Sequence, residues 1–164
     1  IAVNSGGSFR DAESILDQTL TFTAGLGKKK ISAKDIQDLL GIVDINLASR
    51  LADFISKKEV SGALNFLQTV LEKGIDPQEL AKVLIRYFRQ ALLLKINPDL
   101  LNPVIAGLTK EEQEKIKVQT AAFDEKELHR ILELFLEAEN KMKYSPIPQL
   151  PLELAIIEAI EPKE

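Results

Sequence analysis

A chain of 164 residues with 45% hydrophobic and 28% charged side chains can form one packed domain, and this composition excludes a disordered chain. Cysteine is absent and His129 is the single histidine, which excludes disulfide frameworks and thiolate zinc sites. No apolar run reaches about 18 residues, so we expect no membrane span. Because the chain opens on Ile1 and Met142 is its one methionine, we expect a piece of a longer protein.

The spacing of the apolar residues predicts helices almost throughout. Apolar side chains recur at i, i+3 and i+4, and no segment alternates apolar and polar residues for more than a few positions. The first predicted helix covers residues 9–22, with Ser8 as its N-cap. A stretch containing glycine and lysine follows at residues 24–30. This stretch is therefore the best candidate for a boundary between two substructures.

The second part of the chain starts with three predicted helices. Ser32 caps the first of them, which ends at Gly41, and Asp44 caps the next. The third begins near residues 59–61 and stops at Gly74. Each of these helices carries one apolar face, so each is expected to pack against a neighbour.

A long helix is predicted over residues 77–96, because Asp76 is a good N-cap and proline suits the first helical position. Its apolar stripe widens towards Ile96, so several neighbours must cover that end. Two Asn-Pro pairs then make residues 97–107 irregular.

Three helices complete the predicted fold. Thr109 caps a polar helix over residues 110–123, and Asp124 caps the next, which extends to about Met142. The last helix, over residues 151–160, is apolar nearly all round and is typical of a core helix. The sequence therefore predicts an all-α fold, a globular bundle of about seven or eight helices.

The titratable residues do not form a catalytic or metal-binding pattern. His129 has charged neighbours on its own helix, which indicates a solvated histidine. Glu111, Glu112 and Glu114 lie at a helix N-terminus, where the helix dipole favours negative charge. We therefore expect no catalytic residue and no metal ligand.

Four residues are candidates for contacts with a partner chain. Arg86 and Arg89 lie opposite the apolar stripe of the long helix, where they are placed to form ion pairs with a partner. Leu134 and Leu136 lie off the stripe of their own helix. That position predicts a second face, which is partly buried or covered by a partner.

Arg10 has an unusual position in the first turn of its predicted helix, because the helix dipole opposes a cation there. A bound phosphate would explain it, since free N–H groups, the dipole and the guanidinium all favour an anion. Gly6 and Gly7 would let that anion approach the backbone. The alternative is a solvated arginine that follows the end of an earlier helix.

The segment from Gly7 to Gln18, GSFRDAESILDQ, resembles the sensor-2 helix of clamp-loader AAA+ ATPases. It is most similar to the gamma/tau type of subunit in bacterial DNA polymerase III. The similarity continues in the same order through residues 39–44, 74–77, 92–95, 144–146 and 152–155.

This resemblance implies that residues 1–26 are the end of an AAA+ lid and that residues 27–164 form a helical collar. Collars of neighbouring subunits pack into a ring in that family, and ATP then drives loading of a sliding clamp onto primer-template DNA. The implied partners are further copies, delta and delta-prime subunits, accessory subunits, and the clamp and DNA through the ATPase part. Arg10 matches the sensor-2 arginine that contacts nucleotide. The implied location is the bacterial cytoplasm, at the replisome.

The sequence lacks the Gly-x-x-x-x-Gly-Lys-Ser/Thr phosphate loop of such ATPases. We therefore expect no catalysis and no cofactor in this chain, while the full-length subunit would bind ATP and Mg²⁺. An alternative is a nucleic-acid-binding or protein-interaction module unrelated to clamp loading. Lysines at 28–30 and 57–58 favour that alternative, but the formal net charge of −4 argues against DNA binding.

Overall fold

The computed structural model of the chain describes residues 8–25, 44–98, 103–106 and 108–161. The chain divides into two units, residues 1–43 and residues 44–164. All regular elements in the described residues are helices, which confirms the predicted all-α class. The predicted boundary between residues 26 and 27 lies outside the described residues and stays a prediction. The predicted helix between Ser32 and Gly41 also lies outside them.

Helix α1, Phe9–Gly25, belongs to the first unit. The Ser8 Oγ accepts the backbone N–H of Asp11 at 3.3 Å, as expected of an N-cap. The helix continues to Gly25 instead of ending at Phe22. Thr19 and Thr23 donate their hydroxyls to carbonyls one turn earlier, and the Thr23 Oγ1 lies 2.7 Å from the Thr19 carbonyl oxygen. These local bonds satisfy the hydroxyls of the two buried threonines.

The second unit contains the helices that carry most of the described core. The predicted caps Asp44, Asp76, Thr109 and Asp124 all accept backbone N–H groups at the helix starts, and these predictions are confirmed. The elements are α3, Ile45–Ser56; α4, Val60–Glu72; α5, Pro77–Ile96; α6, Pro103–Ala106; α7, Lys110–Gln119; α8, Glu125–Met142; and α9, Leu150–Ile160.

The predicted stop at Gly74 is confirmed by its backbone. Gly74 has a φ of +85°, in the left-handed region that glycine adopts at little cost. Its N–H donates to the Leu71 carbonyl at 2.9 Å, so the turn satisfies a terminal carbonyl of α4. The chain then reverses directly into Asp76 and α5, which places α5 beside α3.

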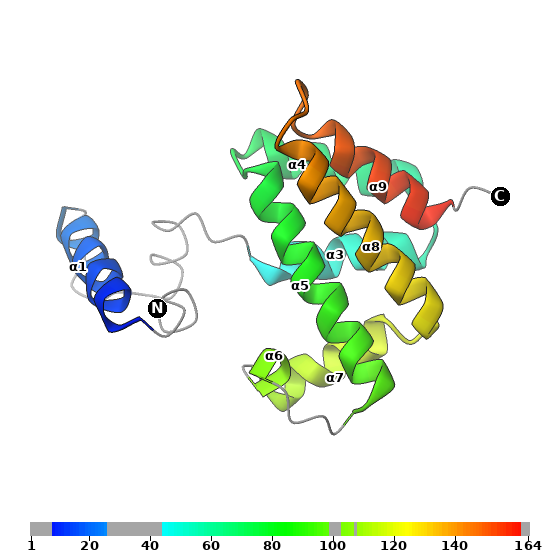
Figure 1. Cartoon of the computed structure of the whole chain (residues 1–164), viewed down its shortest axis with the longest axis horizontal. Helices are drawn as coiled ribbons and strands as arrows, with labels where there is room; N and C mark the ends of the chain where they lie inside the picture. The colour runs from blue at the N-terminus through cyan, green and yellow to red at the C-terminus, as the bar shows by residue number, and fades with distance from the viewer. Residues whose placement is uncertain (1–7, 26–43, 99–102, 107, 162–164) are drawn as a thin grey trace. The chain divides into compact units, whose positions relative to one another are not determined.

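Helix α5 crosses the middle of the unit, and α8 lies beside it (Figure 1). Helix α9 packs along α8 and also contacts α3 and α4, while α7 packs against α3 and α5 at one end. Large side chains that are almost fully buried fill the space between these helices. They include Tyr87 and Phe88 of α5, Phe135 and Leu128 of α8, Leu51 of α3, Leu67 of α4, and Leu152 and Ile156 of α9.

Three expectations about this core need correction. Helix α7 ends at Gln119 instead of Phe123, because Phe123 turns back and packs its ring 6.4 Å from the ring of Phe88. Ile96 was expected in the buried stripe of the long helix, but it is 59% exposed at the helix end. Leu154 is 55% exposed, so α9 is not buried all round.

A polar cluster joins three helices at the edge of this core. The Gln119 Oε1 accepts the hydroxyl of Tyr87 at 2.7 Å and that of Ser49 at 2.8 Å. The Gln119 Nε2 donates to Asp53 Oδ1 at 3.0 Å. Helix α7 buries a single side chain, Ile116, so these hydrogen bonds hold much of its orientation on α3 and α5.

We expect this cluster to make the unit sensitive to alkali. Burial, and then the negative charge of Asp53, raises the pKa of Tyr87 well above its usual value. The folded state therefore holds the phenol proton more tightly than the unfolded state. This contribution is present below about pH 10 and is lost as the pH rises from there towards the folded pKa. Between about pH 8 and pH 11, denaturant unfolding of the wild type should lose more stability than that of Tyr87→Phe. Equal losses of stability in the wild type and in Tyr87→Phe would contradict a raised pKa of Tyr87 in the folded state.

Candidate partner interface

The sequence candidates for chemistry lie in ordinary surface positions. The His129 side chain is 64% exposed, and its Nδ1 lies 3.6 Å from a carboxylate oxygen of Glu133 on the same helix. Glu112 forms a capping box with Thr109 at the start of α7, where its carboxylate accepts the Thr109 N–H at 2.7 Å. Within the described ranges, no three His, Cys, Asp or Glu side chains gather in a way that suits a metal ion.

None of the helices in residues 8–25, 44–98, 103–106 and 108–161 combines the length and hydropathy needed to cross a bilayer. Arg10 lies exposed in the first turn of α1, one residue after the start of the helix. This is the helix position that the sequence predicts for Arg10, and its contact with a nucleotide stays a prediction.

The four predicted contact residues do not form one surface. Arg86 and Arg89 are exposed on α5. Leu136 is 44% exposed, whereas Leu134 is half-buried. Because each residue advances about 100° around a helix, positions two apart lie on opposite sides of the stripe between them. Leu134 therefore faces α9 and Leu136 lies on the other flank of α8.

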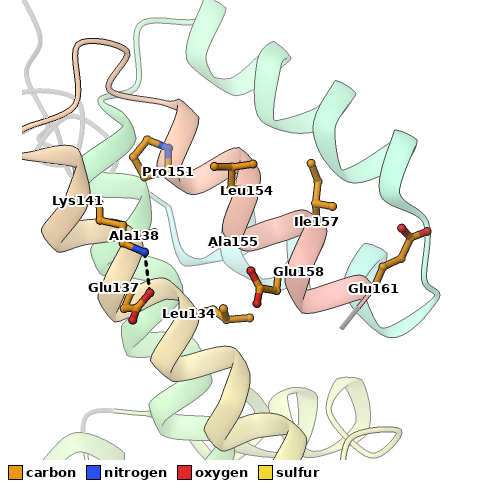
Figure 2. A pocket seen from close by; sticks show the side chains of 10 residues that line it. All are labelled: Leu134, Glu137, Ala138, Lys141, Pro151, Leu154, Ala155, Ile157, Glu158 and Glu161. Atoms are coloured by element: carbon orange, nitrogen blue, oxygen red, sulfur yellow. Dashed lines mark hydrogen bonds and ion pairs between the residues drawn. The ribbon is translucent and has the colours of Figure 1, made fainter. Parts of the chain in front are cut away.

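A groove of about 400 Å³ runs between α8 and α9 (Figure 2). Its apolar wall comes from one side of each helix, and Figure 2 shows the Leu134 side chain between them. The apolar residues that line it are Leu134, Ala138, Pro151, Leu154, Ala155 and Ile157.

The charges along this groove are mostly negative. Three carboxylates, Glu137, Glu158 and Glu161, and one ammonium, Lys141, line it. Lys141 Nζ lies 2.8 Å from a Glu137 carboxylate oxygen, and this ion pair lowers the pKa of Glu137. Both side chains of the pair are exposed, so its contribution to stability is small. The groove therefore combines an apolar wall with net negative charge.

Arg130 fixes the relative position of the two groove helices. Its guanidinium donates to the carbonyl oxygens of Glu158 at 2.7 Å and Ala159 at 3.0 Å, at the C-terminal end of α9. A cation at this end is favoured by the helix dipole. Sequence reasoning missed this role because the bonded groups are 28 and 29 residues apart, and no local pattern marks such a pair.

Further apolar side chains are exposed where α8 turns into α9. Tyr144 is 89% exposed, Ile147 48% and Leu150 39%, and they precede Leu154 at the groove. These side chains leave exposed apolar surface at the turn between α8 and α9.

Comparison with known proteins identifies the family. The family model described as DNA polymerase III subunits gamma and tau domain III matches residues 31–164. The chain belongs to this family. The match includes every described element of the second unit, from α3 to α9. A domain unrelated to these subunits, the alternative drawn from the sequence, is therefore not favoured.

Curated relatives of this family support the assignment over nearly the whole chain. The subunit tau of DNA polymerase III from Bacillus subtilis is 30% identical, covering 96% of this chain and 27% of its own length. The gamma/tau subunit from Mycobacterium bovis is 26% identical, with the same coverage of both chains. The chain thus spans about a quarter of the length of these two relatives.

A solved structure shares the fold. The delta protein of the Bacillus subtilis DNA clamp loader superposes with a TM-score of 0.58, covering 94% of this chain and 47% of its own. The sequence identity is 18%, so this likeness concerns the arrangement of helices. It agrees with the collar-type bundle that the resemblance implied.

Proposed function

We propose that this chain is a helical collar through which clamp-loader subunits of DNA polymerase III assemble. The single observation that carries the proposal is the gamma and tau domain III match over residues 31–164. An all-helical bundle with apolar side chains left at its surface suits a scaffold, since such side chains are the usual material of protein interfaces. The assembled ring would support ATP-dependent loading of a sliding clamp during replication in the bacterial cytoplasm.

The proposed partners are other subunits of the same loader. They include further copies of this subunit, delta-type and delta-prime-type subunits, and accessory subunits. The sliding clamp and primer-template DNA would be reached through the ATPase parts of the assembly. The likeness to a clamp-loader delta protein supports a shared architecture among the ring members.

We propose no catalytic activity for this chain by itself. Phosphoryl transfer needs a phosphate-binding lysine, a magnesium ion and a group that positions water. The sequence carries no phosphate loop to supply the first of these. ATP and Mg²⁺ would be bound by the longer subunit as a whole, within an enzyme complex that acts as a nucleotidyltransferase.

Arg10 is the proposed contribution of this chain to nucleotide binding. Its exposed position in the first turn of α1 is compatible with a contact to a nucleotide phosphate. In a full-length subunit, Arg10→Ala should slow ATP-dependent clamp loading by about tenfold or more, as expected for a lost charge-assisted contact. Assembly of the ring, followed by gel filtration, should not change. An unaltered loading rate would remove Arg10 from the nucleotide site.

Assembly itself is the direct test of the proposed function. The chain, mixed with delta-type and delta-prime-type subunits at micromolar concentration, should co-elute with them in gel filtration. Absence of any complex would count against a collar role.

A further inference from the structure

Helix α5 carries a basic ridge, defined here as Lys82, Arg86 and Arg89. Their spacing of i, i+4 and i+7 aligns them along one stripe of the helix. All three are exposed, whereas Leu84, Phe88 and Ala91 of the same helix are buried on the opposite side. Lys82 Nζ lies 2.6 Å from a Glu79 carboxylate oxygen on the same helix, so a partner would meet mainly the guanidinium groups of Arg86 and Arg89.

The groove between α8 and α9 has the complementary properties. Its walls are apolar, and its charged side chains are three carboxylates and one lysine. The aliphatic stems of arginine and lysine pack well on apolar surface while their charged ends reach carboxylates at the rim. Leucine and alanine side chains such as Leu134 and Ala138 offer that surface on α8.

The two surfaces also match in length. The ridge spans eight residues of α5, and the α8 side of the groove spans eight residues from Leu134 to Lys141. At a rise of about 1.5 Å per residue, each is about 10 Å long. One ridge therefore fits along one groove.

Both surfaces are present on every copy, and they lie on different sides of α8. Helix α8 contacts α5 on one flank and α9 on the other (Figure 1). A molecule therefore cannot place its own ridge in its own groove, and it can offer both surfaces at once. A contact between two different surfaces of identical chains is head-to-tail and propagates to a ring or a filament.

We propose that the basic ridge of α5 docks in the α8/α9 groove of a second copy of this chain. This inference rests on the proposed collar function and specifies which faces meet. Arg86 and Arg89 of one copy meet the carboxylates that line the groove of the second copy. Lys141 pairs with Glu137 within one molecule. In the complex, the arginines of the other copy bind the same Glu137 carboxylate as Lys141 does. Opposite charges across the contact favour this register over a ridge-to-ridge or groove-to-groove pairing.

Charge reversal tests the pairing. The ridge variant carries Arg86→Glu and Arg89→Glu, and the groove variant carries Glu137→Lys and Glu161→Lys. The control carries Lys110→Glu and Lys126→Glu, two exposed positions in first helical turns where an acid is favoured. The control changes the net charge as much as the ridge variant does. Circular dichroism verifies that all four proteins are folded.

Sedimentation velocity at low salt then measures self-association up to about 500 µM, a range that includes weak homotypic contacts. We expect the wild type and the control to associate in a concentration-dependent way. Each variant alone should associate at least about tenfold more weakly, because like charges then meet across the contact. An equimolar mixture of the two variants should associate again, since their reversed charges are complementary.

Three results would overturn the pairing: a wild type that stays monomeric, variants that associate like the wild type, or a mixture that does not recover. A wild-type chain that co-elutes with the other loader subunits in any of these cases would leave the collar function standing. Failure of that co-elution would instead overturn the collar function itself.

Discussion

Replacing Phe88 with alanine is expected to lower the free energy of unfolding of the second unit by about 3–5 kcal/mol. Phe88 is fully buried in α5, stacks on Phe135 of α8 at 5.6 Å, and meets Phe123 edge-on at 6.4 Å. Removing its ring leaves a cavity where α5, α8 and the turn before α8 meet. Such a loss is a large part of the roughly 5–15 kcal/mol that stabilises a typical domain.

Chemical denaturation with circular dichroism measures this loss. Tyr144→Ala is the matched control, because it also removes an aromatic ring but from a residue that is 89% exposed. The control should change stability by no more than about 0.5 kcal/mol. A Phe88→Ala protein as stable as the control would contradict the described packing of α5 on α8.

Arg130→Ala is expected to cost about 2–3 kcal/mol, the second largest effect. It removes two charge-assisted hydrogen bonds, at 2.7 and 3.0 Å, and leaves the terminal carbonyls of α9 without these donors. It also removes a cation from a helix C-terminus, where the dipole favours one. Because α9 is held less firmly, hydrogen exchange should accelerate at its C-terminal turn before the rest of the unit.

Arg130→Lys separates the charge from the geometry. Lysine keeps the positive charge but cannot reach two carbonyls with one planar group, so we expect roughly half of the alanine loss. Equal stability of Arg130→Ala and the wild type would show that the two bonds do not hold α9 in solution.

The helices could be predicted from the sequence because their signals are local. Asp76 followed by proline fixes the start of α5, since the cap and the first turn are neighbours in the chain. Thr109 with Glu112 does the same for α7. The predicted end of α7 is wrong because Phe123 leaves the helix. Its ring packs on Phe88, which lies 35 residues earlier in the chain and also stacks on Phe135, 12 residues after Phe123.

The candidate site could be predicted only in part. The spacing on α8 marked Leu134 and Leu136 as lying off the buried stripe, but it did not tell which of them faces α9. That distinction depends on α9 packing against α8, a contact between distant segments. Gln119 and Arg130 were missed for the same reason, since their partners come from other helices.

The family, by contrast, was readable from an ordered series of short motifs. No single segment such as GSFRDA determines it, but motifs in the same order along most of the chain do. The match to gamma and tau domain III over residues 31–164 confirms that interpretation. The roles of Arg10, Arg86, Arg89, Leu134 and Leu136 stay predictions until the variants are measured.

The central claim is that this chain works by assembly, and competition in a clamp-loading reaction tests it most directly. The chain is added in increasing excess to a complete loader that is being assembled from its subunits with ATP, clamp and primer-template DNA. We expect clamp loading to fall in proportion to the excess, because the chain takes positions in the ring without bringing an ATPase. Adding an excess of the full-length subunit should restore clamp loading. Undiminished loading at about a tenfold excess, with no chain recovered in the loader by gel filtration, would contradict the collar role.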